Sequence, residues 1–119
     1  MGHVRISLRL ANPERPDEFV DVESALVDTG ATFTTIPRRI ATDLGLKPVR
    51  QRQIRTASGH QTLEESYALF EYAGNRTVTP VLVTDSLDFV LVGVITLESL
   101  ALVVDPNKGE LREAEVYLL

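Results

Sequence analysis

The triplet Asp28-Thr29-Gly30 is the part of the sequence whose residue types are best suited to chemistry. It follows the apolar run at residues 25–27 and precedes a Thr- and Phe-rich segment at residues 31–37. Asp and Gly also favour tight turns between strands, so a plain turn is the structural alternative for the same residues. The setting, a carboxylate at the end of an apolar strand, favours acid–base chemistry.

A single aspartate is not enough for that chemistry. It cannot activate a water molecule and protonate a leaving amine at once, whereas two carboxylates that share one proton can. The chain contains one Asp-Thr-Gly triplet. The second carboxylate would come from a second copy of the chain, because a two-fold axis places the same residue opposite itself. Catalysis by Asp28 therefore implies a homodimer.

Other catalytic classes find few residues here. The chain has no cysteine, which removes disulfides, thiolate metal sites and cysteine nucleophiles. His3 and His60 lie far apart, without ligand-like spacing and without a GxSxG-type elbow nearby. Phosphate-binding glycine loops are absent, and the second aspartate of an aspartyl phosphotransferase is replaced by Gly30. We expect no metal and no cofactor.

Length and composition set the broad class. The 119 residues, 44% hydrophobic and 24% charged, predict one globular domain over residues 1–119. The net charge of −5 argues against nucleic-acid binding, which requires phosphate neutralisation. No apolar run approaches membrane-spanning length and no signal core is apparent, so we expect a cytoplasmic protein without a membrane contact.

A local basic run departs from the acidic average. Lys47, Arg50, Arg52 and Arg55 fall within nine residues. Runs of charge usually form a solvated loop or strand edge. The alternative is a contact for an acidic segment of a substrate.

The hydrophobic pattern predicts mostly strands. Val4, Ile6, Leu8 and Leu10 alternate with polar residues, as in a half-buried strand. Further strands are expected from residue 19 up to the triplet, in a hairpin exposed on both faces at residues 49–66, and at residues 67–72, 77–84 and 88–95. Residues 103–111 predict a strand, a turn and a return, and residues 115–119 a closing strand.

Breaks in the pattern predict short helices and an edge. Pro37 suits the first turn of a helix and Gly45 its C-terminal end. A second helix is expected over residues 97–102, capped by Thr96. Pro80 predicts an edge or a bulge in its strand.

The segment "LVDTGATFTTIP" resembles the active-site segment of the retroviral-type (retropepsin-like) aspartic proteases. A second mark of that family, two hydrophobic residues and a glycine before a short helix, is matched by Leu91-Val92-Gly93. A glycine-containing hairpin, the flap, is matched between them by "IRTASGHQTLEE". The tail "LALVVDPNKGEL" is similar to the ending of bacterial and archaeal members. The resemblance spans Val4 to Leu111.

The resemblance implies an all-β fold, a closed barrel with one or two short helices, and a homodimeric aspartic endopeptidase acting on peptides or proteins. Asp28 would be catalytic, Thr29 would hydrogen-bond across the dimer axis, and Gly30 would let the substrate backbone approach. Ala31 would line the floor of the site. The alternative is a non-catalytic dimerisation or peptide-binding module on the same fold.

The remaining family positions carry over with one departure. Thr56, Ala57, Ser58, Gly59 and His60 would form the flap tip that closes over the peptide. Gly93 would pack in the loop behind the active site. Viral members commonly place Arg or Asn after that glycine, whereas this chain has Val94, so the contacts of that side chain are absent. Residues 4–10 and 115–119 are equally suited to an interleaved dimer interface and to the domain's own sheet.

Overall fold

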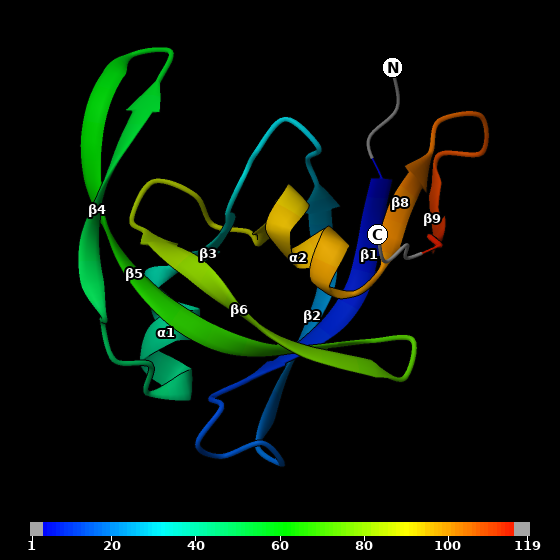
Figure 1. Cartoon of the computed structure of the whole chain (residues 1–119). Coiled ribbons are helices and arrows are strands. Elements are labelled where there is room, and N and C mark those ends of the chain that lie inside the picture. Colours follow the sequence, from blue (N-terminus) through cyan, green and yellow to red (C-terminus); the bar gives the residue numbers. More distant parts are fainter. Residues whose placement is uncertain (1–3, 116–119) are drawn as a thin grey trace, which may run out of the picture.

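Six strands close into a barrel in the computed structural model, which describes residues 4–115 (Figure 1). Their order is β1-β2-β7-β3-β6-β5, and the pairing of β1 with β5 completes the ring. The β2–β7 and β3–β6 pairs are parallel, and the other pairs are antiparallel. The six strands are β1 (Val4–Ala11), β2 (Phe19–Val27), β3 (Thr34–Pro37), β5 (Gly59–Tyr72), β6 (Asn75–Thr84) and β7 (Leu91–Val92).

The barrel encloses the core that the alternating pattern predicts. Val4, Ile6, Leu8 and Leu10 of β1 are all buried, while the residues between them are exposed or half-buried. They pack with apolar side chains from the other barrel strands and both helices, among them Ile36, Phe70 and Val92. This confirms the predicted mostly β fold.

The strand β4 (Arg50–Thr56) lies outside the ring and pairs only with the first half of β5. The two form the green hairpin that extends away from the barrel at the left of Figure 1. The second half of the predicted hairpin and the predicted strand at residues 67–72 form one continuous strand of 14 residues, Gly59–Tyr72. The expectation that both hairpin faces are exposed is wrong, because alternate residues of β4 are half-buried.

Pro80 lies at an edge and not at a bulge. The β5–β6 ladder runs through the Tyr67–Pro80 pair without a change of register. Pairing of β6 with β3 begins one residue later, at Val81. The missing N–H of Pro80 therefore interrupts no ladder, as expected for proline at a strand edge.

The helix α1 (Arg38–Leu44) confirms the prediction from Pro37 and Gly45. Pro37 is the extended residue at its N-terminal boundary, and Gly45 ends it in the left-handed conformation with φ of 65°. The Gly45 N–H bonds to the Thr42 carbonyl oxygen at 3.0 Å. A left-handed C-terminal residue is readily accommodated by glycine because it has no Cβ.

The second helix and the strand before it differ from the prediction. The apolar residues 88–95 form only the two-residue strand β7, and α2 (Val94–Ser99) begins directly after Gly93. Val94 and Ile95 donate their N–H groups to the loop carbonyls of Ala31 and Thr32 rather than to a neighbouring strand. Thr96 is no cap: it lies inside α2 and is fully buried.

The chain ends in a second, two-stranded sheet. β8 (Leu102–Asp105) and β9 (Glu110–Glu113) pair antiparallel, which confirms the predicted strand, turn and return. The N-terminal strand β1 completes the domain's own barrel, and residues 116–119 of the predicted closing strand lie outside the described residues. No helix in residues 4–115 is long and apolar enough to span a membrane.

Candidate active site

Asp28 stands at the first position after β2. Its N–H donates to the Val92 carbonyl oxygen at 2.9 Å, which extends the parallel pairing of β2 with β7 by one residue. Its carboxylate oxygen Oδ1 accepts the N–H of Gly30 at 2.9 Å, and its carbonyl oxygen accepts the N–H of Ala31 at 3.1 Å. The turn alternative is therefore present locally, but it holds a half-buried carboxylate at the surface of the barrel.

The loop after Asp28 is fastened to the N-terminus of α2. The carbonyl oxygen of Ala31 accepts the N–H of Val94 at 2.8 Å, and that of Thr32 accepts the N–H of Ile95 at 3.0 Å. Gly93 makes this approach possible, because a Cβ at this position would lie 2.5 Å from the carbonyl carbon and oxygen of Phe33. The two sequence marks, residues 28–31 and 91–93, are thus brought into direct contact.

A buried cluster of three threonines supports the same contact. Thr34 Oγ1 accepts the N–H of Gly93 at 3.0 Å and lies 2.6 Å from Thr96 Oγ1, which lies 3.1 Å from Thr79 Oγ1. All three side chains are buried. The sequence pattern predicts Thr96 to be a helix cap and Thr79 to lie in a strand, so it does not reveal this cluster. A threonine at a core position of the strand pattern was the available signal.

Thr29 and Gly30 are exposed, and Ala31 is half-buried. The Thr29 hydroxyl makes no hydrogen bond to any residue of the described chain. A Cβ on Gly30 would lie 3.2 Å from Asp28 Oδ1, so this position lacks room for a side chain without a shift. Because Thr29 and Gly30 are exposed, the surface beside the Asp28 carboxylate is open to a partner molecule.

The five predicted flap residues lie at the tip of the β4–β5 hairpin. Ala57 and Ser58 form the turn, and Gly59 has a φ of 123° that other residues rarely adopt. Thr56 Oγ1 donates to the carbonyl oxygen of Gly59 at 3.0 Å and thereby ties the turn. His60 is exposed and pairs in register with Arg55.

A groove of about 420 Å³ joins the active-site loop to the hairpin. Its floor and walls come from the loop, β3, β4 and β6; the lining residues are Gly30, Ala31, Thr32, Phe33, Thr35, Arg52, Gln53, Ile54, Arg55 and Leu82. Because the groove runs from the residues beside Asp28 to β4, it is suited to an extended peptide.

Arg52 and Glu65 form an ion pair at this groove that sequence reasoning missed. The Arg52 guanidinium lies 4.7 Å from the centre of the Phe33 ring, and its Nε donates to Glu65 Oε1. Arg50 Nε lies 3.3 Å from the other carboxylate oxygen. The hydrogen bond from Arg52, assisted by Arg50, lowers the pKa of the buried Glu65 carboxyl, although burial opposes the shift. Arg52 is thus not a solvated residue of the basic run.

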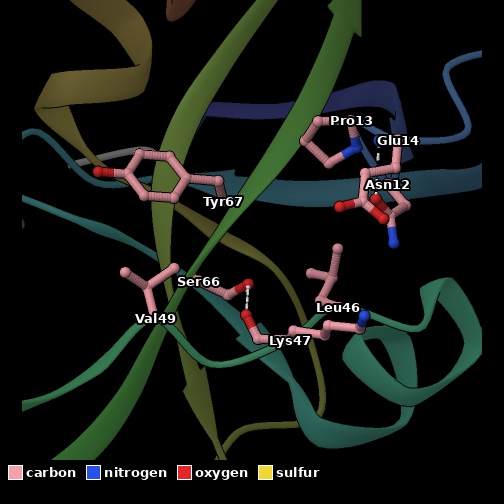
Figure 2. Close-up of a pocket in the computed structure, with 8 residues that line it drawn as sticks. All are labelled: Asn12, Pro13, Glu14, Leu46, Lys47, Val49, Ser66 and Tyr67. Carbon is pink, nitrogen blue, oxygen red and sulfur yellow. Dashed lines mark hydrogen bonds between the residues drawn. The ribbon is translucent and has the colours of Figure 1, made fainter.

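A second hollow, shown in Figure 2, lies away from the active-site loop. Its lining includes Pro13, Leu46, Val49 and Tyr67, and none of the residues from 28 to 35. Ser66 already donates its hydroxyl to the Lys47 carbonyl oxygen at 2.6 Å. Among residues 4–115, no three His, Asp or Glu side chains gather in a way that could hold a metal ion.

Known proteins resemble this chain in sequence family and in fold. The sequence model of a family described as "Aspartyl protease" matches residues 20–114. The fold is similar to that of simian foamy virus (mac) protease, with a TM-score of 0.59 and 20% identity over 79% of this chain and 91% of that one. No curated protein sequence gives a significant match.

Two further structures are similar to a comparable degree. EIAV protease, complexed with the inhibitor HBY-793, gives a TM-score of 0.59 with 18% identity over 98% of this chain and 94% of that one. A retropepsin-like aspartic protease from Rickettsia conorii gives 0.60 with 20% identity over 87% and 77%. These likenesses establish the fold, and the family match establishes descent: the chain is a member of the aspartyl protease family with a retropepsin-like fold.

Proposed function

We propose that the protein is an aspartic endopeptidase that works as a homodimer, with Asp28 from each copy in one active site. The observation that carries this proposal is the half-buried Asp28 carboxylate, presented by a fastened loop beside a groove open to the hairpin. Family membership implies peptide substrates. One copy supplies one such carboxylate, so a second copy across a two-fold axis completes the pair.

In this proposal the paired carboxylates share one proton and hold one water molecule between them. The ionised carboxylate takes a proton from the water as its oxygen attacks the peptide carbonyl carbon. The protonated carboxylate donates a hydrogen bond to the carbonyl oxygen. A proton then passes to the leaving amine, the C–N bond breaks, and the pair returns to its shared-proton state. No covalent intermediate with the protein is required.

Several features of the single chain support this assembly. The Thr29 hydroxyl is exposed and has no partner in residues 4–115, as needed for a hydrogen bond across an axis. Three backbone hydrogen bonds fix the loop before a substrate arrives: Val92 accepts one, and Val94 and Ile95 each donate one. Such pre-organisation reduces the reorganisation that the reaction would otherwise require. The exposed hairpin tip is free to close over a bound peptide.

The direct test incubates the wild-type protein and Asp28→Asn with a diverse peptide library from about pH 4 to pH 7, with cleavage products identified by mass spectrometry. We expect cleavage by the wild type alone. Asp17→Asn is the matched control, because Asp17 lies in the exposed loop between β1 and β2; this variant should retain full activity. Cleavage by Asp28→Asn would overturn the proposal. Peptide binding without cleavage by a wild-type dimer would favour the non-catalytic module.

A further inference from the structure

One wall of the groove carries a row of side chains whose chemistry differs from that of a plain apolar pocket. Thr35 and Leu82, which line the groove, are direct neighbours across β3 and β6; Glu65 of β5 pairs with Leu82 on its other side and does not itself line the groove. Side chains of directly paired residues project from the same face of a sheet. Phe33 and Arg52 lie over the same part of the groove, in contact with each other. The row therefore combines a hydroxyl, an aliphatic side chain, an aromatic ring and a guanidinium.

The Thr35 hydroxyl has no hydrogen-bond partner. Its Oγ1 is the one buried side-chain polar atom in residues 4–115 that lacks such a partner. Its cross-strand neighbours are Leu82 and Leu91, which offer no polar atom from their side chains. Buried polar groups are almost always paired in native proteins, and an exception calls for an explanation. Thr35 lines the groove, but its Oγ1 is closed to solvent in the free chain. Rotation of the side chain toward the groove would bring this hydroxyl to a bound ligand and give it a partner.

The charge of the groove is positive. Arg50 and Arg52 share the single carboxylate of Glu65, so this group of three carries a net charge of +1. Arg55 also lines the groove and makes no ion pair within the described chain. The lining contains no Asp or Glu. Arg52 uses only its Nε toward Glu65, so its two terminal amino groups remain available for an acceptor on a ligand.

We propose that this groove accepts an acidic side chain, glutamate or aspartate, of the peptide substrate. The proposal deepens the proposed function and rests on it. The terminal amino groups of Arg52 bind the substrate carboxylate, and the Thr35 hydroxyl donates a hydrogen bond to it. Phe33 and Glu65 hold the guanidinium in place from two sides. Stacked and ion-paired arginine is pre-organised, so little side-chain freedom is lost when the substrate binds.

The expected selectivity follows from the chemistry of the two donors. A glutamate side chain accepts from both donors and carries the complementary charge. Glutamine keeps the acceptor without the charge, leucine leaves the Thr35 hydroxyl unpaired, and lysine adds a like charge. Hydrogen bonds to ionised groups are roughly twice as strong as neutral ones. We expect kcat/KM to fall about tenfold from glutamate to glutamine, and further for leucine and lysine.

The test uses peptides built on a cleaved sequence from the library. Each position near the scissile bond is changed in turn to Glu, Gln, Leu or Lys, and kcat/KM is measured for the wild type, Thr35→Val and Arg52→Gln. One position should show a marked preference for Glu. Thr35→Val should reduce the advantage of Glu over Leu severalfold with unchanged folding, and Arg52→Gln should abolish the advantage of Glu over Gln. Arg112→Gln, the same change at an exposed residue of β9, should alter neither.

A binding measurement separates this inference from the proposed function. Fluorescence anisotropy on Asp28→Asn reports the groove without turnover. It uses a labelled library peptide that binds this variant, whether or not the wild type cleaves it, with each position changed in turn to Glu, Gln, Leu or Lys. Tighter binding of the Glu peptide, with no cleavage by the wild type, would uphold the groove and reject the endopeptidase. Cleavage by the wild type with equal kcat/KM for Glu, Gln and Leu at every position would overturn the acidic preference. Equal binding of all peptides to Asp28→Asn would also overturn it.

Discussion

The α-carbon of Gly93 lies directly against the backbone carbonyl of Phe33. A Cβ built on Gly93 would stand 2.5 Å from that carbonyl carbon and oxygen, and 2.9 Å from the Ala31 carbonyl oxygen. Real Cβ atoms essentially never come that close to another heavy atom. The glycine after β7 therefore sets how closely the segment before α2 can approach the active-site loop.

The variant Gly93→Ala should displace that loop. Backbone atoms cannot yield as the end of a side chain can, so we expect a loss of about 1–3 kcal/mol in the free energy of unfolding. The kcat/KM for peptide cleavage should fall further than the loss of folded protein explains, because the displaced loop carries Asp28. Urea denaturation and kcat/KM measure the two effects. Gly109→Ala is the control: its Cβ would meet no atom within 4 Å and only its φ of 64° is strained, so activity should be unchanged.

The neighbouring residues Thr34 and Thr35 allow a matched pair of variants. Thr34→Val removes the acceptor for the buried Gly93 N–H and the partner of Thr96 Oγ1, so the free energy of unfolding should fall by about 1–3 kcal/mol. Thr35→Val makes the same change where the hydroxyl is unpaired, and stability should hold or rise. Thermal denaturation of both variants tests this. Equal losses would show that the threonine cluster contributes nothing specific.

Glu65 should make stability depend on pH. Arg52 and then Arg50 lower the pKa of its carboxyl from the ordinary value of 4.5. A carboxyl with a lowered pKa in the folded state stabilises the fold above its unfolded pKa, and this contribution is lost as pH falls through the folded pKa. Glu65→Gln should cost on the order of 2 kcal/mol at neutral pH, since two arginines lose their counter-charge.

The difference in the free energy of unfolding between wild type and Glu65→Gln should narrow when urea denaturation is repeated below about pH 4.5. Glu18→Gln is the matched control. Glu18 pairs with Arg15 at 3.1 Å, but its side chain is 70% exposed, and exposed pairs contribute little. If wild type and Glu65→Gln differ in free energy of unfolding by the same amount from neutral to acidic pH, the role of the ionised Glu65 carboxylate is contradicted.

Local patterns in the sequence were enough to predict the parts of the fold that depend on neighbouring residues. The alternation in β1, the boundaries of α1 at Pro37 and Gly45, and the hairpin at residues 49–66 all follow from such patterns. The segment at residues 88–95 misled because an apolar run fits a buried strand and a buried helix equally well. Its division at Gly93 depends on contacts with Ala31 and Thr32, which lie about sixty residues away in the sequence.

The candidate site likewise combines features that local sequence patterns predict with features that depend on contacts between distant segments. Asp28, the flap tip and Gly93 carry recognisable motifs, but Arg52 was hidden in a run of basic residues. Its role depends on Phe33 and Glu65, which reach it from the active-site loop and from β5. Likewise, the unpaired state of Thr35 becomes visible only when Leu82 and Leu91 are known to flank it. Pairings between distant strands determine both features, and periodicity does not report them.

The central claim is that one active site needs Asp28 from two copies, and subunit mixing tests it most directly. Wild type and Asp28→Asn are mixed at a fixed total concentration, well above the dissociation constant of the dimer, and allowed to exchange before the cleavage rate is measured. If both carboxylates are required, the rate follows the square of the wild-type fraction, so an equal mixture retains about one quarter of the wild-type rate. A linear decline, with about one half retained, would contradict the claim.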